Sequence, residues 1–93
     1  MIVHLSVHTP KPGKEQDLID SMHRYAAAGE GQPGFIDAKT LRDRHTGRLI
    51  GMARWEDEES WRVGVDAMRA AVADDPFDEW EAAEVDGFFL EEV

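Results

Sequence analysis

Three polar side chains near the amino terminus are spaced for chemistry on a β-strand. His4, Ser6 and His8 alternate with apolar residues, and a period of two places alternate side chains on one face of a strand. His4 and Ser6 then lie about 6.6 Å apart along the strand. A neutral histidine near pH 7 can accept a proton from a substrate. His4 is therefore the candidate base. The alternative is that His4 has only a structural role, as a hydrogen-bonded histidine in the core.

The other histidines do not predict a metal site. His8 comes just before Pro10, where the strand ends, so we expect it at the surface. His4 and His8 are about 13 Å apart along a strand, too far to share one ion. His23 and His45 have no ligand partners nearby in the sequence. The chain has no cysteine, which excludes thiolate zinc sites, iron–sulfur clusters and cysteine nucleophiles. We therefore expect neither a metal nor a cofactor.

No other catalytic or nucleotide-binding arrangement can be read from the sequence. No Ser-His-Asp order appears, nor a glycine loop that would cradle phosphate. Aromatic side chains are the remaining candidates. Tyr25 continues the apolar stripe of a predicted helix and would hold a substrate oxygen, whereas Trp61 lies on the stripe of a second helix and would wall a pocket. Plain core packing is the alternative for both residues.

Composition and charge predict one small globular domain, residues 1–93. The chain has a net charge of −10, with eight basic and six acidic residues in the first 54 but two and fourteen in the remaining 39. This charge repels nucleic acid and anionic lipid. No apolar run approaches the roughly 18 residues of a membrane span, and the first residues lack the pattern of a signal peptide. We expect a cytoplasmic protein.

The hydrophobic periodicity predicts strands and helices in the order β-α-β-β-α-β. Such a chain has the ferredoxin-like α+β arrangement, a four-stranded antiparallel sheet with helices on one face only. The expected elements are a strand at Ile2–His8, a helix at Lys14–Ala28, strands at Phe35–Arg42 and Arg48–Trp55, a helix started by Asp57-Glu58-Glu59, a short helix after Asp75, and a strand at Val85–Val93.

Local patterns add expectations about individual side chains. Strict alternation in the second strand places Phe35 with Leu41 on one face, opposite Ile36 and its alternates. Asp75 is expected to cap the short helix, with Pro76 as its first residue.

Arg54 should face away from Trp55, toward the acidic stretch Glu56–Glu59 or a carboxylate of a partner chain. A sheet covered on one side exposes an apolar face on the other. A second copy of the chain is the simplest cover for it, so we expect a homodimer.

Three short motifs resemble those of a known family. They are Pro12–Glu15 after the first strand, Gln32–Phe35 before the second, and Arg54–Glu59 at the end of the third. In this order they resemble the antibiotic biosynthesis monooxygenase (ABM) domain, over nearly the whole chain. The resemblance implies the dimeric α/β-barrel form of the ferredoxin-like fold, with a ligand cavity between the helices and the sheet. It also implies oxidation of polycyclic aromatics or quinols with dioxygen and without metal or flavin, or, in a second branch, degradation of haem.

Matching this chain to the haem-degrading branch leaves that branch's functional positions unfilled. Its strand asparagine falls on Ser6, its helical tryptophan on Gly64, and its histidine near Asp74, and no histidine follows His45. Haem degradation is therefore disfavoured. The same alignment implies that the strand face carrying His4 and Ser6 points toward the cavity.

The resemblance thus implies a cofactor-independent monooxygenase acting on a small phenolic or quinol-like aromatic, in which loss of the phenolic proton makes the ring electron-rich enough to react with dioxygen. His4 is the expected catalytic residue, and Ser6, Tyr25 and Trp61 are the expected substrate-binding residues. A non-catalytic small-molecule-binding or stress-response domain of the same fold is the alternative. Isomerisation or dehydration is a third possibility, which needs an acid–base pair such as His4 with Asp37 facing one cavity.

Overall fold

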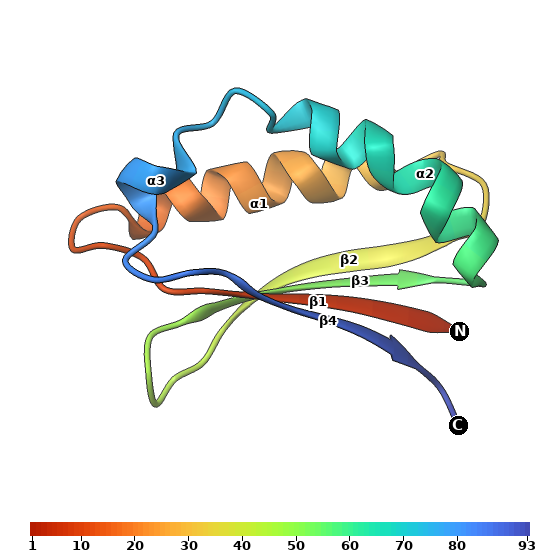
Figure 1. Ribbon diagram of the computed structural model, residues 1–93, viewed down its shortest axis with the longest axis horizontal. Coiled ribbons are helices and arrows are strands. Elements are labelled where there is room, and N and C mark those ends of the chain that lie inside the picture. Colours follow the sequence, from red (N-terminus) through yellow and green to blue (C-terminus); the bar gives the residue numbers. More distant parts are fainter.

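The computed structural model describes residues 1–93 and has one sheet with helices on one of its faces (Figure 1). The sheet is antiparallel throughout, with strand order β2-β3-β1-β4. This confirms the predicted ferredoxin-like α+β fold. None of the helices is both long and apolar enough to cross a bilayer. The elements are β1 (Ile2–His8), α1 (Glu15–Gly29), β2 (Phe35–Arg42), β3 (Leu49–Trp55), α2 (Glu58–Ala71), α3 (Phe77–Trp80) and β4 (Asp86–Glu91).

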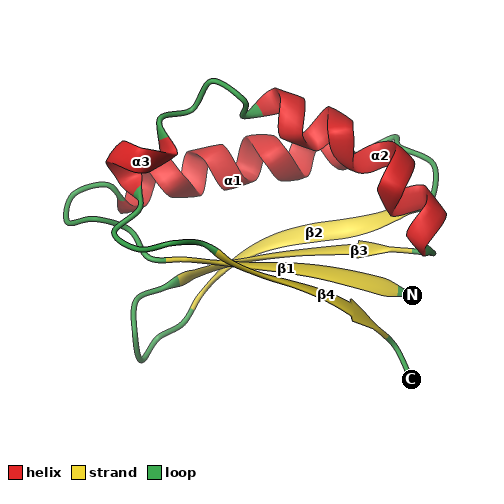
Figure 2. Cartoon of the chain, in the orientation of Figure 1, coloured by secondary structure: helices red, strands yellow, loops and turns green.

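The register of the central strand β1 decides which side chains face the helices. His4 lies between Ala53 of β3 and Phe89 of β4, and Ser6 lies between Gly51 and Gly87. The helices cover one face of the sheet and leave the other bare (Figure 2). His4, Ser6, Gly51 and Ala53 line the cavity on the covered face, so the alternate rows face the bare side. The period-two pattern therefore predicted the two faces of β1 correctly.

The second strand departs from strict alternation. Its register shifts between Phe35 and Asp37, so Ile36 is an extra residue, a β-bulge. Phe35 consequently faces the helices, with its ring 5.0 Å from that of Trp55, while Leu41 faces the bare side. The prediction that Phe35 and Leu41 share a face was wrong because a bulge reverses the alternation.

The helices begin where acidic residues cluster. The Asp57 carboxylate accepts a hydrogen bond from the Ser60 amide at 2.8 Å, which caps α2 as predicted. Glu15 and Asp17 lie in the first turn of α1, where negative charge complements the helix dipole. The loop after β2 closes at Gly47, whose φ of 77° requires the left-handed region that glycine tolerates.

The hydrophobic core consists of two separate clusters. Leu49 begins β3 and belongs to one cluster, and Trp55 ends β3 and belongs to the other. Between them, on the helix-facing side of β3, lies Gly51, which has no side chain. The middle of the sheet is therefore left thinly covered. The clusters are Leu18, Met22 and Leu49, and Ala53, Trp55 and Met68.

Changing Gly64 to alanine is expected to destabilise the fold. A Cβ there would lie 2.5 Å from the Trp55 ring, which is itself fully buried. Such overpacking costs about 1–3 kcal/mol, whereas the same change at an open helix position stabilises by up to about 1 kcal/mol. Urea unfolding measures the sign. Gly87→Ala, with open space around its Cβ, is the control, and an unchanged or raised midpoint for Gly64→Ala would contradict this packing.

Candidate functional site

A cavity of about 200 Å³ lies between the sheet and the helices, at the gap between the core clusters. Half of its sixteen lining residues are hydrophobic. Strand β1 supplies two histidines and a serine, the helices supply Tyr25 and Arg69, and β2 and β3 supply mostly small residues, whereas β4 supplies none. The lining includes His4, Ser6, His8, Tyr25, Ala38, Thr40, Gly51, Arg69 and Phe77.

His4 lines the cavity and lies against two aromatic rings. Its ring is 6.0 Å from that of Trp61 and 6.5 Å from that of Phe89. Burial, and to a lesser degree the positive charge of Arg69, lowers the pKa of His4 below its ordinary value of 6.5. His4 is therefore neutral near pH 7, the form that accepts a proton.

Arg69 is a cavity residue that the sequence reasoning missed. It projects from α2, and its guanidinium carbon lies 6.0 Å from the centre of the Trp61 ring. Its spacing of eight residues from Trp61 puts both on the same side of the helix, a signal that would have found it. Arg69 gives the cavity a positive charge beside the imidazole of His4.

The predicted aromatic residues occupy different positions. Tyr25 lines the cavity from α1, and burial raises the pKa of its hydroxyl, which stays protonated and can donate a hydrogen bond. Trp61 does not line the cavity; it packs 4.4 Å from Phe89 and supports His4 from behind. Its buried indole nitrogen has no partner.

His8 is not the surface residue that its position near a strand end predicted. Its side chain is 13% exposed, and its Nδ1 lies 2.7 Å from the Glu81 carboxylate. Its Nε2 lies 2.9 Å from the Ser6 hydroxyl. Glu81 is 73 residues away in the sequence, and no local pattern connects the two.

Asp37 and Arg54 lie on the bare face of the sheet, away from the cavity. The guanidinium of Arg54 donates two hydrogen bonds to Asp37, at 2.7 and 2.6 Å. These bonds lower the pKa of Asp37. The expected pairing of Arg54 with Glu56–Glu59 was therefore wrong, and Asp37 cannot act with His4 across the sheet.

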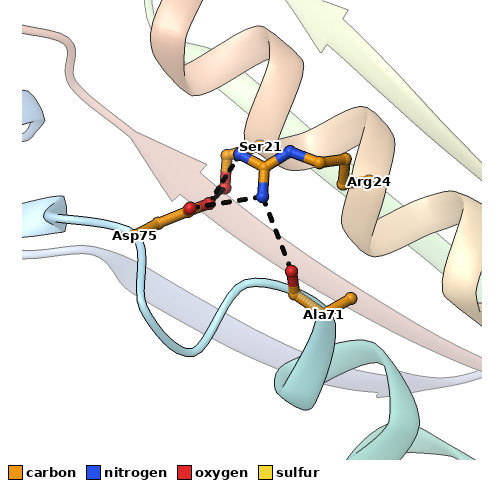
Figure 3. Close-up of polar contacts among 4 residues, drawn as sticks. All are labelled: Ser21, Arg24, Ala71 and Asp75. Atoms are coloured by element: carbon orange, nitrogen blue, oxygen red, sulfur yellow. Dashed lines mark hydrogen bonds and ion pairs between the residues drawn. The ribbon is translucent and has the colours of Figure 1, made fainter.

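Asp75 connects α1 to the segment after α2 and does not cap α3 (Figure 3). It accepts a hydrogen bond of 2.6 Å from Ser21, a fully buried hydroxyl, and two from Arg24 at 3.2 and 2.9 Å. The predicted cap was wrong because these long-range donors take the carboxylate. The connection holds the chain that leads into α3, whose Phe77 closes one end of the cavity.

Acid should weaken this connection. Hydrogen bonds from Arg24 and Ser21 lower the pKa of Asp75 from its ordinary 3.8, so the folded state favours the carboxylate. The ionised Asp75 therefore stabilises the folded state fully above pH 3.8, and this stabilisation is lost as the pH falls through the lower pKa of the folded state. Urea unfolding should show Asp75→Ala less stable than wild type by about 1–2 kcal/mol at neutral pH, with a smaller gap below pH 3.8. A gap that is independent of pH would contradict this assignment.

Metal ligation has no support in the side-chain geometry. No group of three or more His, Cys, Asp or Glu side chains converges anywhere in the chain. The polar groups of the cavity are instead suited to exchanging protons and to stabilising an anion.

Solved structures with the same fold were found at low sequence identity. A conserved protein from Methanosarcina mazei Go1 is 17% identical, with a TM-score of 0.82 over 99% of this chain and 92% of that one. SnoaB, a cofactor-independent oxygenase from Streptomyces nogalater, is 19% identical, with a TM-score of 0.73 over 99% and 94%. MhuD, solved with two manganese protoporphyrin IX molecules per active site, is 20% identical, with a TM-score of 0.77 over 100% and 95%. At these identities the likeness establishes the fold.

A search among curated proteins finds no match. The comparison of the sequence with family profiles is more specific. The profile described as "Antibiotic biosynthesis monooxygenase" matches residues 1–74, from β1 through α2 and into the segment held by Asp75. This chain therefore belongs to the antibiotic biosynthesis monooxygenase (ABM) family.

Proposed function

We propose that the protein is a cofactor-independent monooxygenase that oxidises a small, single-ring phenol or quinol with dioxygen. The observation that carries the proposal is the cavity's combination of a neutral histidine in a largely apolar wall and a cation, Arg69, at its solvent-exposed edge. His4 is held neutral by burial, and Arg69 lies at the same cavity. An apolar cavity binds the ring, and the two polar groups act on its hydroxyl.

The chemistry begins with a proton transfer. His4 accepts the phenolic proton, and Arg69 stabilises the phenolate that results. The anion reduces dioxygen and forms a bond from a ring carbon to oxygen. Loss of water then leaves a carbonyl on the ring, so one oxygen atom enters the product and the other becomes water. The substrate supplies all the electrons. Tyr25 donates a hydrogen bond to a second oxygen, and Ser6 contacts the ring edge.

The size of the cavity supports a single ring. An apolar cavity of roughly 150 Å³ is enough for benzene, and this one is about 200 Å³. A tetrapyrrole is far larger. In addition, the space at Gly64, where the haem-degrading branch has its tryptophan, is taken by the Trp55 ring. Both observations favour a small phenol over haem.

The alternative functions have less support. A purely binding domain would be favoured by aliphatic walls without ionisable groups, yet histidine, tyrosine and arginine side chains line this cavity. Isomerisation would need Asp37 to act with His4 in one cavity. Asp37 lies on the other face of the sheet, so this acid–base pair does not form.

Two copies of the chain pair through their bare sheet faces. Leu41, Phe88 and Leu90 are 45%, 47% and 42% exposed there, a large apolar content for a surface that faces water. The charged residues in the same rows are balanced, two acidic and two basic, so the net charge of −10 is not concentrated on this face. They are Asp37, Asp86, Lys39 and Arg54.

Oxygen uptake with a panel of hydroxylated aromatics tests the proposed site. Single-ring substrates should be consumed faster than three-ring ones. Ala38→Phe, which fills the cavity, should lower uptake at least tenfold. Ala27→Phe on the exposed side of α1 is the matched control and should not. Equal uptake by both variants, after subtraction of spontaneous oxidation, would place the reaction elsewhere.

A further inference from the structure

Ser6, His8 and Glu81 form a hydrogen-bonded chain, of which the proposed oxidation uses only Ser6, as a contact to the ring edge. The Ser6 hydroxyl lies 2.9 Å from His8 Nε2, and His8 Nδ1 lies 2.7 Å from a Glu81 carboxylate oxygen. The His8 and Glu81 side chains are 13% and 7% exposed. Ser6 and His8 both line the cavity. A serine, a histidine and a buried acid thus follow one another at hydrogen-bond distance.

The backbone holds Glu81 in place next to β1. The Lys11 amide donates to the Trp80 carbonyl at 2.8 Å, and the Ala82 amide donates to the Thr9 carbonyl at 2.6 Å. Pro10 and Glu81 form an antiparallel bridge between these bonds. The acid is therefore fixed on both sides by main-chain contacts and cannot swing freely away from His8.

This order of contacts sets the protonation of the imidazole. A carboxylate only accepts hydrogen bonds, so the Nδ1 beside Glu81 carries the proton. Nε2 is then the acceptor, and it faces the Ser6 hydroxyl. An activated serine requires this arrangement, in which a base touches the hydroxyl and an acid orients the base. The pattern is recognised by geometry and not by chain order, which is why the sequence did not indicate it.

The cavity leaves room for a substrate beside Ser6. Ser6, Gly51 and Thr40 form one row across three strands, so the serine and the threonine are roughly 9.6 Å apart, two strand spacings. Gly51 between them has no side chain, and a Cβ there would lie 2.8 Å from the Ser6 hydroxyl. The same Cβ would lie 3.3 Å from the Met22 methyl group, so only glycine here lets the Ser6 side chain lie over β3, with Thr40 beyond it in the row.

We infer that Ser6 is an activated nucleophile that takes an acyl group from a small ester bound in this cavity. The Ser6 oxygen bonds to the ester carbonyl carbon as its proton passes to His8 Nε2. The carbon–oxygen bond to the leaving group then breaks, and His8 returns the proton to the departing alcohol. Water, deprotonated by His8, next attacks the acyl-serine, which releases the carboxylic acid and restores the serine.

The surroundings of Ser6 set the range of esters. β1 is paired on both sides, so its backbone amides are engaged in the sheet and are not free to stabilise an oxyanion. One such donor raises the rate of acyl transfer by about 10²–10³-fold. Donors among the cavity residues include the hydroxyls of Thr40 and Tyr25 and the guanidinium of Arg69. We therefore expect acylation by esters with good leaving groups, such as p-nitrophenyl acetate.

Labelling with a fluorophosphonate, followed by intact-mass and peptide analysis, tests this inference. One adduct per chain is expected, on Ser6. Ser6→Ala should abolish it, and Glu81→Gln should slow labelling and p-nitrophenyl acetate cleavage at least tenfold. His23→Gln, at an exposed histidine of α1, should react as wild type does.

Folding of each variant is checked by circular dichroism, and the reactions are run without oxygen, so the result is independent of the proposed oxidation. Failure of the folded wild type to form an adduct, an adduct on another residue, or unchanged rates in Ser6→Ala or Glu81→Gln would overturn the inference.

Discussion

Replacing His4 with alanine is expected to lower the rate of oxygen uptake by roughly 10²–10⁴-fold, the usual contribution of a positioned acid or base. The imidazole is held neutral beside Arg69, and the other histidine of the cavity, His8, is engaged with Ser6 and Glu81. The effect should fall mainly on kcat, because the apolar walls that bind the ring remain. Oxygen-electrode kinetics at saturating substrate measure it.

The pH profile and a matched variant separate a catalytic role for His4 from a structural one. Because burial lowers its pKa, His4 loses its accepting form only as the pH falls below 6.5, so the acid limb of the wild-type profile should lie below that value. His23→Ala, at an exposed histidine, should retain full activity. Equal rates for His4→Ala and wild type would remove His4 from the mechanism.

Substituting Leu5 with aspartate is expected to convert the proposed dimer to a monomer. Leu5 lies in the middle of the bare face, between Met52 and Phe88, and in a symmetric pair each copy would bury an unpaired carboxylate. The dimer should weaken at least a hundredfold, which corresponds to about 2.7 kcal/mol. Sedimentation should give twice the 10.5 kDa chain mass for wild type and the single mass for the variant.

A control on the helix side tests whether the effect belongs to the sheet face. Val63 is 63% exposed on α2, and Val63→Asp adds the same charge away from the bare face. It should sediment as wild type does. A wild-type chain that is monomeric at micromolar concentration, or a Val63→Asp variant that dissociates as readily as Leu5→Asp, would exclude pairing through the bare face.

The fold could be predicted from the sequence because its signals are local. Alternation of polar and apolar residues identified β1, and the acids before α2 gave its start at Asp57. The same reasoning failed at Ile36, since a bulge adds one residue without changing the composition of the strand. It failed again at Asp75, where the residues of a helix cap serve a contact with Ser21, 54 positions away.

The candidate site was only partly predictable for a related reason. Alternation placed His4 and Ser6 on one face, and helical spacing placed Tyr25 on the inward stripe; all three line the cavity. The acid that orients His8 lies in a loop at the other end of the chain. No periodicity links such residues, because only the closing of β4 beside β1 brings them together.

Oxidation of a single-ring quinol with isotope-labelled dioxygen tests the central claim most directly. The protein is first treated with chelator and freed of flavin, and the product is reduced at once to the aromatic triol, whose oxygens do not exchange with water. We expect one labelled oxygen in the product for each dioxygen consumed, and the other in water. A product without label, or uptake that requires added flavin or metal, would contradict a cofactor-independent monooxygenase.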